Sequence, residues 1–194
     1  MARYTNECGC FVCDQNGILQ QYIPCDGNMV NLWDKDASDG KMAVTNMIIP
    51  ENITGFVNEF FRFAVVTNTF KLPDSLRSIG TCDRSSGSPA CVFANCNLPD
   101  VILPEGLYEI GTFAFGKCEI KSLRIPYNLR SPYARQFKDS HIGTLLLPAI
   151  YRDGDVSGGN ADSVQMLRNG NMDGPLGFLG NFKWHVRIDH IHWY

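Results

Sequence analysis

The chain has 194 residues, of which 44% are hydrophobic and 19% are charged. This length and composition predict a folded globular chain with one continuous core or two small ones, and they argue against disorder. The formal net charge of -3 gives no broad positive field, which argues against nonspecific binding to nucleic acid or to acidic lipid. No apolar run approaches the roughly 20 residues that a membrane span requires, so none is expected.

The first residues, from Met1 to Gly9, contain no apolar stretch of the kind that a secretory signal needs. The sequence as given therefore predicts a cytoplasmic location. A secreted or cell-surface location is the alternative, if a native leader precedes this sequence.

Residues 1–46 are expected to form an N-terminal capping region that contains a β-hairpin. Two apolar runs between Phe11 and Tyr22 flank the dipeptide Asn16-Gly17, which is favoured in hairpin turns. Residues 29–33 could add a degenerate strand.

Cysteine is the unusual residue, with eight in the chain. An even number invites a disulfide framework, but that interpretation is strongest for short secreted chains, so reduced thiols are the first expectation. Cys8, Cys10, Cys13 and Cys25 follow the pattern C-x-C-x2-C-x11-C and could be the four soft ligands of a structural zinc site. Zinc would stabilise a cap that has little core of its own. The pattern lacks the paired C-x2-C knuckles of zinc ribbons, so zinc, free thiols and disulfides all remain open.

An internal repeat dominates the middle of the chain, residues 47–150. An apolar residue followed by proline recurs five times, with intervals of 23, 31, 22 and 22 residues between the prolines. The long interval fits the others once an insertion near residues 81–90 is removed. Cys82 and Cys91 bracket this insertion and could close it by a disulfide; an ordinary loop is the alternative.

Several columns of like residues follow when the units are aligned on their prolines. Eleven places after the proline stands a phenylalanine, and fourteen places after it a small residue. The two columns are Phe61, Phe93, Phe115 and Phe137, and Ala64, Cys96, Cys118 and Ser140. A unit of about 22 residues cannot bury its own apolar face, so the units must stack and each column must become a ladder inside one core. Cys96 and Cys118 are therefore expected to be packing residues.

Each unit is expected to contribute one short strand that ends at its proline, which cannot donate to a sheet ladder. The predicted strands are 47–49, 69–72, 101–103, 123–125 and 145–147. Stacked in order, they predict a parallel sheet.

Residues 103–126, with the sequence LPEGLYEIGTFAFGKCEIKSLRIP, resemble one unit of the BspA-like (Treponema pallidum type) bacterial leucine-rich repeats. The hairpin of residues 11–22 is similar to one that often opens such arrays. The resemblance implies a right-handed solenoid, with short parallel strands on one face and loops and short helical turns on the other. It also implies adhesion or protein binding without catalytic residues. Family members are often longer than this chain and exported.

Residues 151–194 are expected to form a mixed C-terminal cap within the same structural domain. Asp162 to Gly170 predicts one short helix, with an aspartate N-cap and a glycine stop. Residues 174–180 have turn composition, and residues 184–194 alternate like a strand.

Three further groups of polar residues could bind metals, and each has a simpler interpretation. Residues 153–158 begin like a calcium loop, but position twelve is Val164 where a bidentate glutamate is needed, which favours a turn. Asp34, Asp36 and Asp39 fit that loop less well. His190 and His192 share one face of the last predicted strand, with Asp189 expected on the opposite face; a surface or oligomer contact is favoured over a metal site.

Motifs of common catalytic sites are absent: the sequence contains no G-x-S-x-G, P-loop, H-E-x-x-H or G-x-G-x-x-G pattern. The sequence therefore predicts a protein that is not an enzyme. The least supported alternative is an enzyme that uses C-terminal residues gathered in a cleft, namely His185, Asp189, His190 and His192.

The outward-facing residues of a repeat sheet can be read from their distance to the prolines. The row two places before each proline is Ile48, Lys71, Ile102, Arg124 and Leu146, and the next row is Asn46, Thr69, Asp100, Ser122 and Thr144. The first row mixes apolar and cationic residues, as expected of a contact site, unless a terminal segment folds over it.

The leading hypothesis is a non-enzymatic leucine-rich repeat protein without a cofactor that binds a protein partner through this row. The alternative is a small zinc-binding structural or regulatory protein that uses the N-terminal cysteines.

Overall fold

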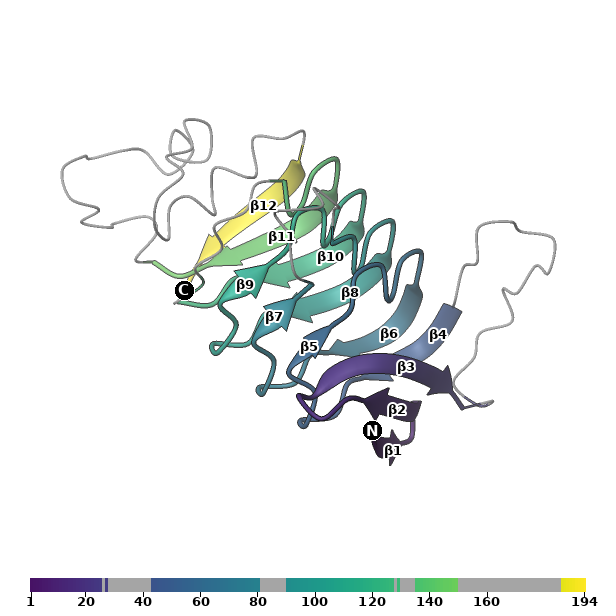
Figure 1. Cartoon of the computed structure of the whole chain (residues 1–194). Helices are drawn as coiled ribbons and strands as arrows, with labels where there is room; N and C mark the ends of the chain where they lie inside the picture. Colours follow the sequence, from purple (N-terminus) through teal and green to yellow (C-terminus); the bar gives the residue numbers. More distant parts are fainter. Residues whose placement is uncertain (26, 28–42, 81–89, 128, 130–134, 150–185) are drawn as a thin grey trace.

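The computed structural model describes residues 1–25, 27, 43–80, 90–127, 129, 135–149 and 186–194. Figure 1 shows the repeats stacked along one axis, with the N-terminal strands at one end of the array and β12 at the other. The predicted helix of residues 162–170, residues 29–33, the two aspartate groups and Cys82 lie outside the described residues. Among the described residues, no helix is long and apolar enough to cross a membrane.

The N-terminal segment forms an antiparallel sheet of β1 (Ala2–Asn6), β2 (Gly9–Cys13) and β3 (Ile18–Pro24). The predicted hairpin is confirmed, because β2 and β3 pair with Phe11 opposite Tyr22. Its turn needs a glycine, since Gly17 has a φ of 79°. The Asp14 carboxylate accepts hydrogen bonds from the backbone N–H groups of Asn16 and Ile18. Sequence patterns did not indicate β1.

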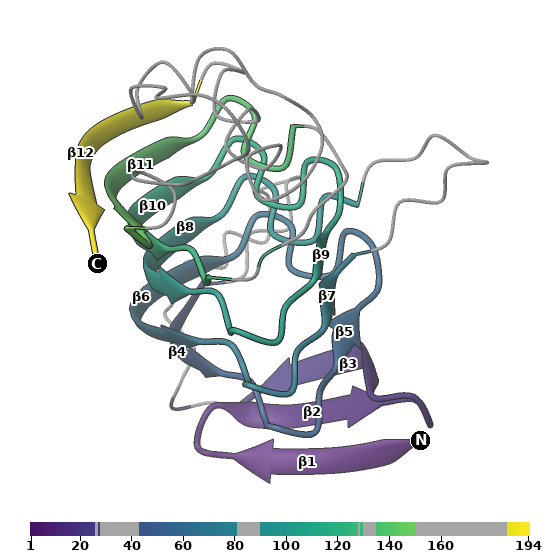
Figure 2. The same ribbon diagram turned by 90° about the vertical axis from the view of Figure 1, so that its left-hand side faces the viewer.

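This N-terminal sheet packs against the first repeat. β3 pairs in parallel with the two-residue strand β5 (Gly55–Phe56). Phe11 is fully buried and stacks on Tyr22, whose ring also contacts the edge of Phe61. In Figure 2 the sheet lies across the end of the array.

The repeats form one parallel six-stranded sheet with the order β12-β11-β10-β8-β6-β4. Its strands are β4 (Ala43–Ile48), β6 (Val65–Lys71), β8 (Asn97–Ile102), β10 (Glu119–Arg124), β11 (His141–Leu147) and β12 (Arg187–Trp193). The first five overlap the predicted strands and begin four residues earlier. β4, β6, β8 and β10 end one residue before the predicted end, and β11 ends at it. β12 lies within the strand predicted at residues 184–194, and it joins the repeat sheet instead of forming a separate element.

The side of the core opposite the six-stranded sheet differs from the prediction. Where short helical turns were predicted, the described residues contain the two-residue strands β5, β7 (Ser78–Ile79) and β9 (Glu109–Ile110), joined by tight turns. Figure 2 shows these short strands facing the six-stranded sheet. The right-handed course of the chain and the capping roles of the two ends stay predictions.

The turns that carry the phenylalanine column explain why no helix forms there. In each turn, the residues two places before and two places after the phenylalanine have a positive φ, between 47° and 67°. They are Glu59 and Phe63, Cys91 and Asn95, Phe113 and Lys117, and Arg135 and Asp139. A left-handed residue interrupts a right-handed helix, so three residues are all that remain between the two breaks.

Hydrogen bonds between consecutive turns compensate for this strained backbone. Phe61 N–H donates to the carbonyl of Val92 at 2.8 Å, and Phe115 N–H donates to the carbonyl of Gln136 at 2.9 Å. Neighbouring residues of the same turns repeat the pattern, as in Phe63 to Ala94 at 2.9 Å. The turns therefore form a third hydrogen-bonded surface of the solenoid.

The predicted phenylalanine ladder is confirmed. Phe61, Phe93, Phe115 and Phe137 are buried, and their rings stack at centroid distances of 5.3, 5.2 and 5.2 Å with interplanar angles of 5°, 15° and 5°. Stacked aromatic pairs contribute about 0.5–1.5 kcal/mol each beyond the area that they bury.

The small-residue column has a structural role that its size alone did not reveal. The Cys96 and Cys118 thiols donate to the carbonyls of Phe61 and Phe93, at 3.0 and 2.9 Å. The Ser140 hydroxyl donates in the same way to Phe115 at 2.6 Å. The column therefore ties each turn to the ladder phenylalanine of the preceding unit.

Replacing Phe115 by alanine should lower the free energy of unfolding by about 3–5 kcal/mol, because it opens a cavity and removes two ring contacts. Chemical denaturation would measure this change. The control is Tyr108→Ala, since Tyr108 is 55% exposed and its loss should cost less than about 0.5 kcal/mol. Equal effects of the two substitutions would contradict the ladder as the centre of the core.

Cys118→Ser should keep the hydrogen bond to Phe93, because Ser140 makes the same contact one unit later. Cys118→Ala should lose about 1 kcal/mol more of the free energy of unfolding than Cys118→Ser does. Denaturation midpoints of the two variants, compared at constant slope, check this order. The opposite order would show that burying the serine hydroxyl costs more than its hydrogen bond to Phe93 contributes.

Candidate binding surface on the outer face of the sheet

The predicted contact row lies on the outer face of the sheet, as its spacing from the prolines indicated. Ile48 pairs with Lys71, and Arg124 lies between Ile102 and Leu146 in the strand register. The row continues onto β12, where His192 stands opposite Leu146. We call these six residues the outer row.

Exposure varies along the outer row. Ile102 is 56% exposed, which is high for an isoleucine in the middle of a sheet. The Lys71 side chain is 60% exposed and that of Arg124 35%. Ile48 and Leu146 are half-buried, and Ile48 also packs against the core. Ile102 is therefore the most accessible apolar group of the row.

Both cations of the outer row have a glutamate partner that sequence reasoning missed. Lys71 pairs with Glu51 at 3.8 Å, and Arg124 pairs with Glu105 at 3.9 Å. Each glutamate belongs to the preceding unit and directly follows its proline. The sequence pattern that could have predicted these pairs is a glutamate directly after the proline of one unit, together with a cation two residues before the proline of the next.

The same glutamates also hold the backbone of the following unit. Glu51 accepts a hydrogen bond from the N–H of Asp74 at 2.7 Å, and Glu105 accepts one from the N–H of Tyr127 at 3.0 Å. Because the ion pairs are exposed, each contributes at most about 1 kcal/mol. Their main effect is to neutralise and orient the two cations.

Arg124 is held at a second point by the end of the chain. Its guanidinium lies over the ring of Tyr194, 4.3 Å from the centroid, and Tyr127 contacts the same ring edge-on at 5.6 Å. Burial raises the pKa of Tyr194 above its ordinary value, and its hydroxyl donates to the carbonyl of Ile125. Arginine and tyrosine held in fixed positions beside an exposed apolar residue are typical of binding hot spots.

The second row is polar and also extends onto β12. Asn46 pairs with Thr69, while Asp100, Ser122 and Thr144 lie in register with His190. Asn68, one residue before Thr69, donates to the Asn46 side chain at 2.9 Å. This row offers hydrogen-bonding groups beside the outer row.

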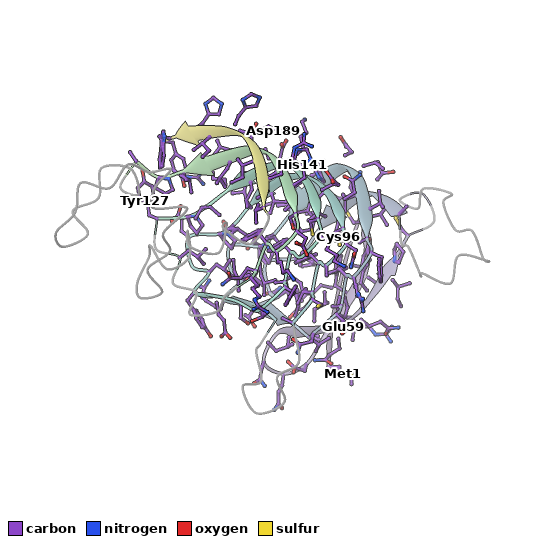
Figure 3. The ribbon with its side chains drawn as sticks, turned by 90° about the horizontal axis from the view of Figure 1, so that it is seen from above. Met1, Glu59, Cys96, Tyr127, His141 and Asp189 are labelled. Atoms are coloured by element: carbon purple, nitrogen blue, oxygen red, sulfur yellow. The ribbon has the colours of Figure 1, made fainter. Side chains whose placement is uncertain are left out.

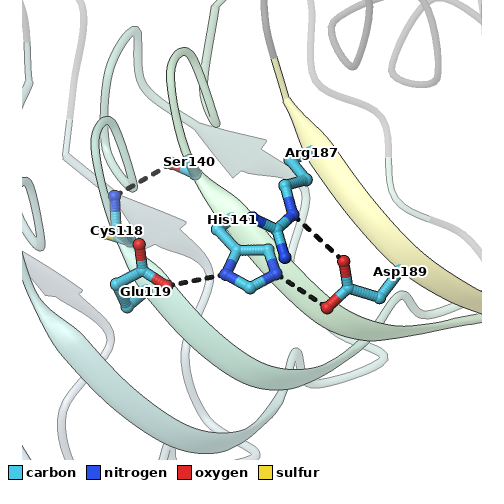
Figure 4. Close-up of polar contacts among 6 residues, drawn as sticks. All are labelled: Cys118, Glu119, Ser140, His141, Arg187 and Asp189. Atoms are coloured by element: carbon cyan, nitrogen blue, oxygen red, sulfur yellow. Dashed lines mark hydrogen bonds and ion pairs between the residues drawn. The ribbon is translucent and has the colours of Figure 1, made fainter.

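One polar cluster on the same face was not predicted. His141 Nδ1 lies 2.8 Å from a Glu119 oxygen, and its Nε2 lies 2.8 Å from an Asp189 oxygen. Arg187 Nε donates to the other Asp189 oxygen at 3.1 Å. Figure 4 shows the chain of contacts, and Figure 3 shows His141 and Asp189 on adjacent strands. We call Glu119, His141, Asp189 and Arg187 the β12 cluster.

Asp189 therefore does not lie on the opposite face from the neighbouring histidines, as strict alternation predicted. Ile188 and Ile191 are the residues of β12 that pack against the core, so both residues between them, Asp189 and His190, face outward. The same irregular step occurs in β10, where Lys121 and Ser122 stand between the core residues Ile120 and Leu123. His185 lies outside the described residues.

Hydrogen bonding sets the electrostatics of this cluster. The bonds to Asp189 and then to Glu119 raise the pKa of His141 above its ordinary value. The bond from His141 and then the one from Arg187 lower the pKa of Asp189.

The four N-terminal cysteines differ in environment. Cys8 and Cys13 are buried in the core, Cys10 is half-buried, and Cys25 is exposed. The Cys25 thiol donates to the carbonyl of Glu7 at 2.9 Å. Among the described residues, no three His, Cys, Asp or Glu side chains form a group that could hold a metal ion. A zinc site made of these cysteines would need them to rearrange, and it stays a prediction.

Repeated units that stack a parallel sheet against short strands, around ladders of like side chains, are typical of solenoid repeat proteins, of which leucine-rich repeat proteins are one class. Residues 89–153 match the family model described as BspA type Leucine rich repeat region, in six copies. This match includes residues 103–126 and agrees with the resemblance that they indicated; it covers about a third of the chain. No curated protein and no solved structure matches it.

Native thiol labelling with a maleimide should separate the cysteines by exposure. We expect Cys25 to react first, Cys10 and Cys91 more slowly, and the buried thiols last. Burial also raises the pKa of Cys8, Cys91 and Cys118, which leaves less reactive thiolate at neutral pH. Peptide mass spectrometry over time measures each site, and Cys25→Ser should remove the fast phase. Labelling of Cys8, Cys10, Cys13 and Cys25 only after a chelator is added would contradict free thiols and support zinc.

Proposed function

We propose that the protein is a non-enzymatic binding module of adhesion or protein-interaction type, which recognises a protein partner through the outer row. Leucine-rich repeat domains commonly mediate protein–protein interactions, and the family match supports this class of function. The single observation that carries the proposal is Ile102, more than half exposed on the central strand β8 and in register with Arg124.

The surroundings of Ile102 fit a protein contact better than a small-molecule site. Arg124 is oriented by Glu105 and Tyr194, so it would lose little rotamer freedom when a partner binds. The half-buried Leu146 continues the apolar surface on the next strand. An apolar centre with oriented polar groups at its edge is the usual anatomy of a protein interface.

The ion pairs argue against a purely electrostatic mode of recognition. Glu51 and Glu105 neutralise both cations of the outer row, so a partner would be selected mainly by apolar fit and by hydrogen bonding. We therefore expect binding to depend weakly on salt.

The test is a quantitative pull-down from the native organism with three forms of the protein. Ile102→Asp places a charge at the centre of the proposed interface and should reduce retention of the specific partner about tenfold or more, since each 1.4 kcal/mol is tenfold. Tyr108→Asp is the matched control, because Tyr108 is equally exposed at 55% but lies on the loop before β9. Partners kept by the wild type and the control but lost by Ile102→Asp support the proposal. Identical protein sets from all three would overturn it.

Charge reversal at Lys71 and Arg124 together is a second test of the same face. Capture should weaken, because both cations become anions beside Glu51 and Glu105 and repel them. Circular dichroism and the denaturation midpoint must show that the fold is kept. An unchanged set of captured proteins would count against the outer row.

A further inference from the structure

We propose that His141 is a pH-sensitive latch, which holds the C-terminal strand β12 in the repeat sheet when the imidazole is protonated. The inference rests on the β12 cluster and is independent of the proposed binding function. Figure 4 shows the geometry: one imidazole on β11 bridges a carboxylate on β10 and a carboxylate on β12.

The two contacts need two donors. Both ring nitrogens of His141 lie 2.8 Å from a carboxylate oxygen, and carboxylates accept hydrogen bonds without donating any. A neutral imidazole carries one N–H, so it satisfies one carboxylate and turns a lone pair toward the other. The observed bridge is therefore the geometry of the imidazolium.

Every charged group whose effect on His141 the structure resolves belongs to this cluster. Glu119 faces it from β10, and Asp189 and Arg187 face it from β12. Arg187 is bound to the far oxygen of Asp189, so it orients that carboxylate toward the imidazole. Asp189 connects β12 to the array through His141. Loss of one proton removes the positive charge that attracts Asp189, whichever ring nitrogen keeps its hydrogen, and so weakens that connection.

The sign of the pH dependence follows from the two shifts. The pKa of His141 is raised above 6.5, so its contribution is fully present below that pH and is lost as the pH rises through the raised pKa. The pKa of Asp189 is lowered below 3.8, so its contribution is present above 3.8 and is lost as the pH falls through the lowered pKa. The latch is thus closed between about pH 3.8 and pH 6.5, and it weakens as the pH rises through the raised pKa of His141.

β12 is the strand on which such a latch can act. Its apolar residues Ile188, Ile191 and Trp193 are half-buried, whereas the equivalent residues of β10 and β11 are fully buried. It stands at the end of the strand order. Local opening is cheapest where buried apolar contacts are fewest, so one polar bridge changes the stability of β12 more than that of β8.

Opening β12 would also alter the outer face. His192 and Tyr194 lie at the C-terminal end of this strand, and Tyr194 holds the Arg124 guanidinium. Release of the strand would leave Arg124 with Glu105 as its remaining contact among those described above.

Hydrogen exchange of the full chain tests the latch. Protection factors, corrected for the intrinsic exchange rate at each pH, are measured for β12 and for β8 at about pH 6 and about pH 8.5. Protection of β12 should fall several-fold relative to β8 as the pH rises. In His141→Gln, the relative protection of β12 should be low at both pH values. In His190→Gln, which removes an exposed histidine of β12 itself, the wild-type pH dependence should remain. Constant relative protection in the wild type would overturn the proposal, and so would an equal loss in His190→Gln.

A second variant keeps the proposal testable if His141→Gln fails to fold. Glu119→Gln removes one carboxylate and leaves the Asp189 bridge, so it should lower the titration midpoint of the His141 imidazole, as measured by nuclear magnetic resonance. The pH at which β12 loses protection should move down with it. If the titration midpoint of His141 shifts and the pH dependence of β12 exchange stays the same, protonation of His141 does not control β12, and the latch is refuted.

Discussion

The stacking of Phe61, Phe93, Phe115 and Phe137 is the constraint on which the other regularities depend. Rings 5.2–5.3 Å apart and nearly parallel require consecutive turns to repeat the same conformation at about the spacing of paired strands, roughly 4.8 Å. That requirement explains why the left-handed residues recur at the same two places of every turn. It also explains why the thiol and hydroxyl groups of the next column find equivalent carbonyls.

The ladders were predictable because each is a column of like residues at a constant distance from a proline. The insertion near residues 81–90 does not disturb them, since Phe61 and Phe93 stack as closely as the uninterrupted pairs. The conformation of the turns was not predictable. Its left-handed positions are occupied by Glu59, Phe63 and six further residues, none of them glycine, so no residue type marks them. The resemblance to known repeats suggested helical turns there, and that expectation was wrong.

The outer row shows which features of a sheet face a sequence can reveal. Distance from the proline predicted which residues face outward, and the exposure of Lys71 and Ile102 agrees with this. It could not show that Lys71 and Arg124 are already paired, because their partners Glu51 and Glu105 stand about 20 residues earlier on the preceding unit. The direction in which a side chain faces follows from its position within one unit. Whether its charge is neutralised depends on a residue of the preceding unit.

β12 carries the same order of core-facing and outward residues as the repeat strands, without their terminal proline. Ile188, Ile191 and Trp193 occupy the register positions of Ile142, Leu145 and Leu147 on β11, so the strand continues the apolar columns. Yet it buries these residues less completely than an inner strand does. A strand with a weaker apolar anchor gains proportionally more from a polar contact that reaches past its neighbour. His141 supplies that contact, because it stands on β11 and bonds both to β10 and to β12. The protonation state of this one side chain therefore affects how firmly the last strand is bound to the repeat sheet.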